Sequence, residues 1–169
     1  MNATPVLTEA EVRKALTEVM DPEIPNLSIV DLGILRSVTL SDASIEVELM
    51  PTFVGCPALD VMKESVRERL GKLAPGMPVE IKVTLDEPWT SDRISEHGRA
   101  VLKQSGFAPP PPMREMPTRR NMIQLMPVVE CPYCNSRNTA MENAFGPTLC
   151  RAIYYCRNCR QPFEQFKQI

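Results

Sequence analysis

A chain of 169 residues, 43% of them hydrophobic and 24% charged, has the composition of a folded globular protein, with room for one ordinary domain and a small second one. No stretch approaches the roughly 20 consecutive apolar residues of a membrane-spanning helix, and residues 1–25 lack the apolar run of a signal peptide. The sequence therefore predicts a cytoplasmic protein whose six cysteines serve metal binding or catalysis rather than disulfides.

The net charge of −2 conceals an uneven distribution. Residues 1–106 hold 11 Lys/Arg and 17 Asp/Glu, whereas residues 107–169 hold 8 and 4. Because binding to a phosphate backbone needs an excess of cations, the acidic N-terminal part argues against nucleic acid there. The mildly basic C-terminal part leaves that partner open on charge alone.

Three helices are predicted in the N-terminal part. Thr8-Glu9-Ala10-Glu11 is a capping box that begins the first, and Asp21-Pro22 ends it, because a residue before proline disfavours the α region. The second is expected to begin at Pro57, since proline suits the first helical position. The third runs from Ser91 to about Gln104 and ends at Gly106, a typical C-terminal cap.

Alternating apolar and polar residues predict three strands, over residues 34–40, 45–50 and 79–86. A short turn at residues 41–43 joins the first two as a hairpin. The resulting order αββαβα predicts an α+β domain, residues 1–106, in which helices pack on a three-stranded mixed sheet.

Residues 107–128 contain Pro109–Pro112, Pro117 and Pro127, and are predicted to form an extended linker. A partner-binding polyproline motif is the alternative, and the spacer is favoured.

The last segment, residues 129–169, contains two CxxC motifs, Cys131/Cys134 and Cys156/Cys159. Two such turns complete a tetrahedron of thiolates, so we expect one structural zinc ion in a zinc-ribbon-like β module with a hairpin across residues 135–155. A redox dithiol and an iron–sulfur cluster are the alternatives. Cys150 is either a small buried residue, the favoured interpretation, or an extra ligand.

Cys56 is the one cysteine outside this tail. It follows Gly55 between a predicted strand and a predicted helix, at or beside the N-cap, where the helix dipole favours a thiolate. Thr52 can donate a hydroxyl nearby. A packed, structural cysteine is an equally weighted alternative. Asp31, which precedes Leu32-Gly33, has the ordinary role of a turn former.

Two groups of motifs resemble known families. The first resembles the SufT-like domain linked to iron–sulfur protein maturation, and the second resembles the D-subunit family of bacterial phenylacetyl-CoA epoxidase. The first group comprises residues 21–25, Val30-Asp31-Leu32-Gly33, Pro51-Thr52, Gly55-Cys56-Pro57 and Pro88-Trp89-Thr90. The second comprises Cys131-Pro132-Tyr133-Cys134, Phe145-Gly146, Thr148, Cys150, Tyr155-Cys156, Cys159, Pro162-Phe163, Phe166-Lys167 and Ile169.

The resemblance implies an accessory protein of phenylacetate degradation that matures a metal centre, with the oxygenase or reductase component of the complex as its client. In that role Cys56 is the functional thiol, a transient ligand of iron or of a cluster, with Thr52 and Asp31 shaping its loop, and the ribbon docks a partner. A single histidine cannot supply the paired Glu-x-x-His motifs of a di-iron oxygenase, so the chain is not expected to be the enzyme itself.

Two other functions stay open: a structural subunit of the epoxidase, and a nucleic-acid-binding ribbon, which is disfavoured and rests on Arg114, Arg119 and Arg120. The short sheet leaves edges that a homodimer could cover.

Overall fold

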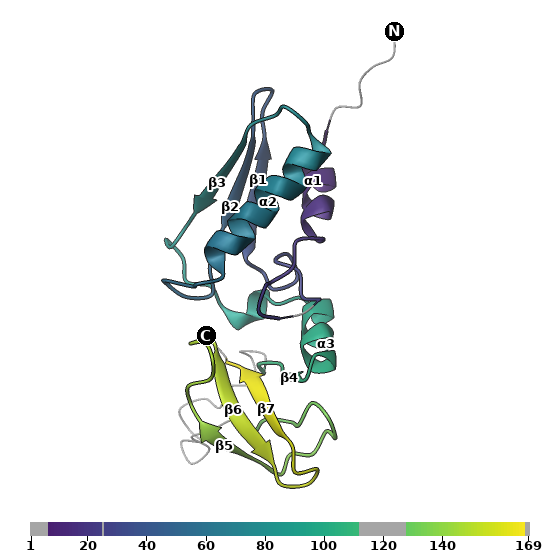
Figure 1. Ribbon diagram of the computed structural model, residues 1–169, viewed down its shortest axis with the longest axis vertical. Coiled ribbons are helices and arrows are strands. Elements are labelled where there is room, and N and C mark those ends of the chain that lie inside the picture. Colours follow the sequence, from purple (N-terminus) through teal and green to yellow (C-terminus); the bar gives the residue numbers. More distant parts are fainter. Residues whose placement is uncertain (1–6, 25, 112–127, 168–169) are drawn as a thin grey trace. The chain divides into compact units, whose positions relative to one another are not determined.

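The computed structural model describes residues 7–24, 26–111 and 128–167. The chain divides between Trp89 and Thr90 into two compact units, the N-terminal unit and the C-terminal unit, each with its own sheet (Figure 1). Among the described residues, no helix has the length and apolarity needed to span a bilayer.

The N-terminal unit has the predicted α+β architecture. Its elements are α1 (Glu9–Leu16), β1 (Leu35–Leu40), β2 (Ile45–Leu49), α2 (Leu59–Leu73) and β3 (Val79–Val83). The sheet has the order β1-β2-β3, antiparallel between β1 and β2 and parallel between β2 and β3. The helices α1 and α2 lie over one face of this sheet (Figure 1).

The capping box at the start of α1 forms as expected. The Glu11 amide donates to the Thr8 hydroxyl at 3.2 Å, and the Thr8 amide donates to the Glu11 carboxylate at 2.9 Å. The helix ends at Leu16, earlier than Asp21-Pro22, and the segment after it turns back so that Met20 bridges Ser28.

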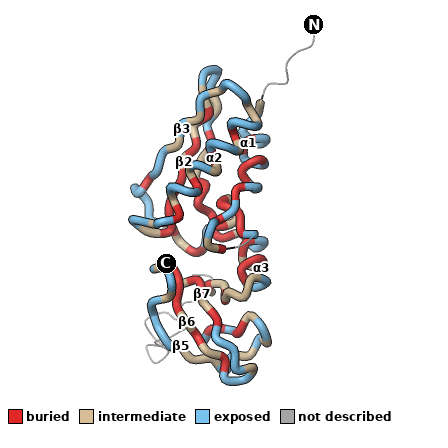
Figure 2. The backbone as a smooth tube through the Cα atoms, viewed as in Figure 1, coloured by how far each residue is buried: buried red, intermediate tan, exposed pale blue. Residues whose placement is uncertain are grey.

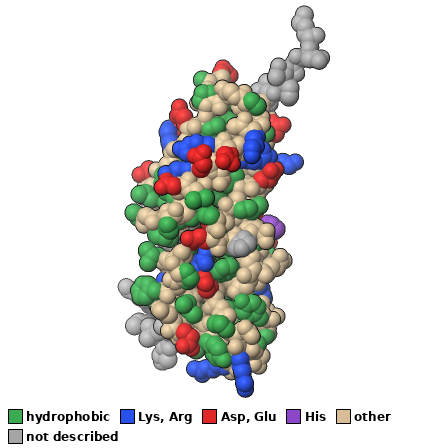
Figure 3. Space-filling view, in the orientation of Figure 1, with side chains coloured by type: hydrophobic (Ala, Val, Ile, Leu, Met, Phe, Trp, Pro, Cys, Tyr) green, Lys and Arg blue, Asp and Glu red, His purple; other side chains and the backbone are tan. Residues whose placement is uncertain are grey.

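The core of this unit lies between the helices and the sheet (Figure 2). A spacing of four residues places Met62, Val66 and Leu70 on the buried side of α2. Alternate residues of β2, Ile45, Val47 and Leu49, are fully buried. Acidic and basic side chains are interspersed over the exposed side of these helices (Figure 3).

The prediction that α2 begins at Pro57 is wrong by two residues. The N-cap is Ala58, because the preceding loop closes through tight i→i+3 bonds, from Cys56 N to Phe53 O at 3.3 Å and from Leu59 N to Cys56 O at 3.2 Å. Cys56 therefore lies two residues ahead of the N-cap rather than on it or next to it.

The C-terminal unit begins with the predicted third helix, which is split in two. A 3₁₀ turn, η1 (Ser91–Arg93), precedes α3 (Glu96–Gln104), because Ile94 is extended and Ser95 caps α3 by accepting from the Gly98 amide at 2.9 Å. Gly106 follows with φ +84, as a helix-terminating glycine should.

A four-stranded sheet completes this unit. Its strands are β4 (Phe107–Ala108), β5 (Thr139–Asn143), β6 (Arg151–Cys156) and β7 (Pro162–Phe166), in the order β4-β7-β6-β5. The predicted hairpin is the antiparallel β5–β6 pair, whereas β7, and β4 parallel to it, were not expected.

The predicted linker thus begins with strand residues, because β4 continues directly from Gly106 and pairs with β7. Its residues 112–127 lie outside the described residues. The proposed limits of the domains otherwise stay predictions.

Candidate functional site

The four cysteines of the two CxxC motifs come together in the C-terminal unit. The Sγ atoms are 3.6 Å apart in the pairs Cys131/Cys159 and Cys134/Cys156, and all four lie within 4.8 Å of one another. A disulfide would need a separation of about 2 Å, whereas a tetrahedral zinc ion with bonds of about 2.3 Å separates its sulfurs by about 3.8 Å. The spacing therefore fits a single metal ion.

The two CxxC turns have the same backbone geometry. In the first, the Asn135 amide donates to Cys131 O at 2.9 Å, and in the second the Arg160 amide donates to Cys156 O at 2.8 Å. Asn135 (φ 57) and Arg160 (φ 61) both take the left-handed conformation, directly after the second cysteine of each motif. This shared turn aims both sulfurs of each pair at one point.

The thiols of the cluster differ in their electrostatic surroundings. Burial raises the pKa of the Cys131 thiol and raises the pKa of Cys159 to about 12. A hydrogen bond from the side chain of Asn158, whose Nδ2 lies 3.6 Å from Cys134 Sγ, lowers the pKa of Cys134 to about 6. Binding of a metal ion requires the thiolate form of all four cysteines, and thiolate sulfurs are ligands that suit a soft cation such as zinc.

Cys150 is near the start of β6 and stays outside the four-cysteine group. Its side chain is buried, and its Sγ lies 3.1 Å from the Thr148 hydroxyl. Its carbonyl accepts from the Lys167 amide at 2.8 Å. Within the described residues, the grouped metal-competent side chains are the four CxxC cysteines alone, which supports the interpretation of Cys150 as a packed residue.

Cys56 occupies the loop between β2 and α2 in the N-terminal unit. It is partly exposed and in no disulfide, and the preceding Gly55 has φ +82, with nothing within 4 Å of a Cβ added to it. Thr52, on the same loop, is 6% exposed. The loop therefore presents the Cys56 side chain partly to solvent while anchoring its own beginning in the core.

Asp31 belongs to a second loop, which leads into β1 at the same end of the sheet. The Ser28 hydroxyl donates to its carboxylate at 2.7 Å, so Asp31 shapes this turn. The Met50 amide donates to Ile34 O at 2.8 Å, which ties the two loops at their roots. The functional roles predicted for Cys56, Thr52 and Asp31 stay predictions.

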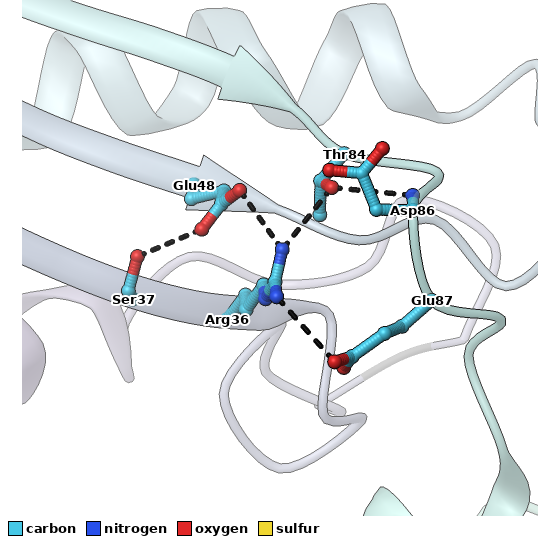
Figure 4. Close-up of polar contacts among 6 residues, drawn as sticks. All are labelled: Arg36, Ser37, Glu48, Thr84, Asp86 and Glu87. Atoms are coloured by element: carbon cyan, nitrogen blue, oxygen red, sulfur yellow. Dashed lines mark hydrogen bonds and ion pairs between the residues drawn. The ribbon is translucent and has the colours of Figure 1, made fainter.

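A polar cluster fastens the strands at this end (Figure 4). One guanidinium nitrogen of Arg36 donates to Glu48 and to the Thr84 hydroxyl, both at 3.1 Å, while the other lies 3.7 Å from Glu87. Ser37 donates to the second Glu48 oxygen at 3.0 Å. The cluster joins β1, β2 and the segment after β3 into one support for the loops.

Sequence reasoning missed this cluster. Arg36 and Glu48 are 12 residues apart and Thr84 is another 36 away, so only the register of the sheet brings them together. The available signal was opposite charge on facing strands of a predicted hairpin. Trp89 belongs to the core of the N-terminal unit: it is 2% exposed and its Nε1 donates to Leu32 O at 3.1 Å.

The chain thus combines an α+β domain with a four-cysteine β ribbon, and each of the two parts matches a family model. Residues 9–85 match the family model described as iron–sulfur cluster assembly protein, and residues 116–167 match the PaaD zinc beta ribbon domain.

The chain belongs to the PaaD family. It is 36% identical, across 94% of its length and 92% of the relative's, to an Escherichia coli protein provisionally named as the D component of 1,2-phenylacetyl-CoA epoxidase.

The N-terminal part has relatives of its own. It is 33% identical to a Porphyromonas gingivalis Fe-S protein maturation auxiliary factor, covering 60% of this chain and 97% of that protein. A Bacillus anthracis domain of unknown function, 27% identical and with a TM-score of 0.52, has a crystal structure that covers 56% of this chain and 90% of that one. A conserved hypothetical protein of Thermotoga maritima matches at 28% identity and a TM-score of 0.50, covering 58% of this chain and 96% of that one.

Proposed function

We propose that this chain matures an iron or iron–sulfur centre of a phenylacetyl-CoA epoxidase complex and does not itself epoxidise the ring. Its membership of the PaaD family and its likeness to Fe-S protein maturation auxiliary factors support this role. The single histidine also falls short of the two that a carboxylate di-iron centre built on paired Glu-x-x-His motifs requires.

One observation carries the proposal for the working thiol. Of the six cysteines, four form the cluster and Cys150 is buried, which leaves Cys56 partly exposed in the part of the chain that matches iron–sulfur assembly proteins. A thiolate there is a soft ligand for iron. Cys56 holds the iron or cluster briefly as cargo, and Thr52 and Asp31 fix the shape of the loops around it.

The four-cysteine centre has a different task in this proposal. Four thiolates around one ion leave no open coordination position, so the metal is structural. Zinc is the ion that we assign, one per chain, because the PaaD ribbon model and the sulfur spacing both suit it. An iron–sulfur cluster at these sulfurs is the alternative, which a broad visible absorption band would reveal.

The test uses two cysteine substitutions in the full chain, co-produced with the epoxidase subunits. We expect Cys56→Ser to leave the folded chain intact by circular dichroism, while the client component is purified metal-poor: the oxygenase low in iron, or the reductase low in iron and sulfide. Cys150→Ser is the matched control, because it also removes a thiol outside the cluster, and its clients should be fully loaded. Normal iron and sulfide in the clients of Cys56→Ser would refute the proposal.

A structural subunit of the complex is the second candidate, because the Escherichia coli relative is named as a component of the epoxidase. The loop between β5 and β6 exposes Phe145 (67%) and Leu149 (60%), which gives the ribbon an apolar contact surface. This role predicts stoichiometric co-purification with the other subunits, and a fully active complex lacking the chain would exclude it. The arginines at positions 114, 119 and 120, on which nucleic-acid binding rested, lie outside the described residues.

A further inference from the structure

The strand β3 has a free outer edge. In the described part of the chain β3 pairs with β2 alone. The Ile45 amide donates to Pro78 O and the Thr84 amide donates to Leu49 O, both at 2.9 Å. In a parallel ladder the backbone N–H and C=O groups of successive residues point alternately to the two edges of the strand. The even-numbered residues of this segment therefore bond β2. The amide and carbonyl groups of Val79, Ile81 and Val83 therefore point outward.

The side chains along this edge are arranged symmetrically by type. The strand reads Val79-Glu80-Ile81-Lys82-Val83, with an acid and a base at equal distances from a central isoleucine. Both charged residues are exposed, and Val83 is 39% exposed. Lys82 pairs with Glu46 at 2.5 Å, whereas Glu80 is in no ion pair among the described residues. A free edge with exposed apolar residues is a template for another strand.

We propose that β3 pairs with β3 of a second copy of this chain, antiparallel, with the two Ile81 residues facing each other on the two-fold axis. The outward groups of Val79, Ile81 and Val83 then meet the same groups of the second copy as hydrogen-bonded pairs. The two sheets continue into one six-stranded sheet, and the interface is self-complementary, as a two-fold contact requires.

Charge selects this register over its neighbours. Shifting the axis by one residue, to position 80 or 82, also brings outward backbone groups together. Such a shift places Glu80 of one copy against Glu80 of the other, or Lys82 against Lys82, in a closely spaced pair. Like charges directly opposite each other are destabilising. With the axis at Ile81, Glu80 of each copy faces Lys82 of the other. Val79 of each copy covers the exposed Val83 of the other.

The other edge of the sheet suits this contact less. Pairing of β1 with β2 is interrupted by a register shift between Leu35 and Ser37, and such bulges bend a strand and discourage further pairing. The strand β3 pairs with β2 without a shift over all five residues. Because two five-residue strands bury little area, we expect a weak dimer with a dissociation constant of about 1 to 100 μM.

Sedimentation velocity of the full chain from about 1 μM to 1 mM tests the proposal. We expect a concentration-dependent monomer–dimer equilibrium. Glu80→Lys and Lys82→Glu should each weaken it about tenfold, because each turns two attractive pairs into repulsive ones. An equimolar mixture of the two variants should dimerise again, since the lysine introduced at position 80 of one then faces the glutamate introduced at position 82 of the other.

Two further variants make the result decisive. Ile81→Pro removes the central outward amide without touching the bonds to β2, and should abolish the dimer if β3 is the contact. Glu68→Lys makes the same charge change on α2 and should leave the dimer unaffected. A chain that is monomeric throughout, or a dimer that Glu80→Lys and Ile81→Pro leave unchanged in folded protein, would overturn the proposal. Pairing of this edge only with a strand of another protein would do so as well.

Discussion

Tyr133 lies directly against Gly106. A Cβ placed on Gly106 would be 2.8 Å from the Tyr133 hydroxyl oxygen, closer than side-chain carbons tolerate. Tyr133 is inside the first CxxC motif, and Gly106 ends α3 in the left-handed conformation. One glycine therefore both terminates this helix and makes room for the metal-binding turn, so α3 and the ribbon pack as parts of one unit.

Replacing Gly106 with alanine should destabilise the C-terminal unit by more than about 1 to 2 kcal/mol. An L residue with positive φ costs about that much, and the new methyl group must also push Tyr133 aside. The three tyrosines all lie in the C-terminal unit and the single tryptophan in the other. Urea unfolding followed by tyrosine near-ultraviolet circular dichroism therefore measures this loss.

The matched control is Gly76→Ala, in the other unit. Gly76 also has positive φ, +87, but nothing lies within 4 Å of a Cβ added to it. The Gly76→Ala variant should therefore lose only the free energy that positive φ costs an alanine, measured by urea unfolding followed by tryptophan fluorescence. In a Tyr133→Ala background, Gly106→Ala should likewise cost only that term. Equal losses from Gly106→Ala with and without Tyr133 would contradict the steric coupling.

Removing the metal should unfold the C-terminal unit selectively. Its core cluster contains Cys131 and Cys156 themselves, so an empty site would leave buried thiols without their cation. On adding a chelator we expect the tyrosine circular dichroism to collapse. The fluorescence of Trp89, buried in the N-terminal unit, should stay that of a buried indole.

Metal content supplies the control for this experiment. Cys156→Ser should lose the bound ion, whereas Cys150→Ser should keep one ion per chain, because Cys150 stands outside the cluster. A chelated chain with unchanged tyrosine signals, or loss of the ion from Cys150→Ser, would show that the four-cysteine centre is not the structural element described above.

Much of the fold could be predicted because it depends on local pattern. The capping box at Thr8 and the alternation in β2 involve neighbouring residues, and both are confirmed. The strand β4 was not predicted, because two residues beside a proline run have no periodicity. It forms only by pairing with β7, which lies more than 50 residues away in the sequence. The beginning of α2 was misplaced because the turn at Cys56 competes with the helix that Pro57 favours.

The four-cysteine cluster and the polar cluster around Arg36 also differ in how far the sequence could predict them. A CxxC spacing fixes the turn by itself, so the cluster of four cysteines was predictable and is confirmed. The support around Arg36 requires the register of three strands, which no local spacing encodes.

The capping box predicts a pH-dependent contribution to stability. Hydrogen bonds from the Thr8 side chain and backbone lower the pKa of Glu11 below its usual 4.5. A carboxyl whose pKa is lower in the folded state stabilises that state above pH 4.5, and the contribution disappears as the pH falls through the folded value.

Thr8→Ala removes the N-cap side chain, which costs about 1 kcal/mol at pH 7, and the loss should be smaller at pH 3. Urea unfolding followed by Trp89 fluorescence measures both values. Thr17→Ala, which removes a hydroxyl bonded to Lys14 O at the other end of α1, serves as the control. A loss for Thr8→Ala that is the same at both pH values would argue against the role given to Glu11.

Arg36→Ala should destabilise the N-terminal unit more than loss of an ordinary surface charge. The Arg36 side chain is 29% exposed and Glu48 25%, so their pair is partly shielded from water, and the same guanidinium also binds Thr84. We expect a loss of about 1 to 2 kcal/mol in urea unfolding followed by Trp89 fluorescence. Arg67→Ala breaks an ion pair with Glu64 whose side chains are 48% and 66% exposed, and should cost less than about 0.5 kcal/mol. Equal losses for the two variants would mean that Arg36 is a surface charge like Arg67 and that the strand ends hold together without it.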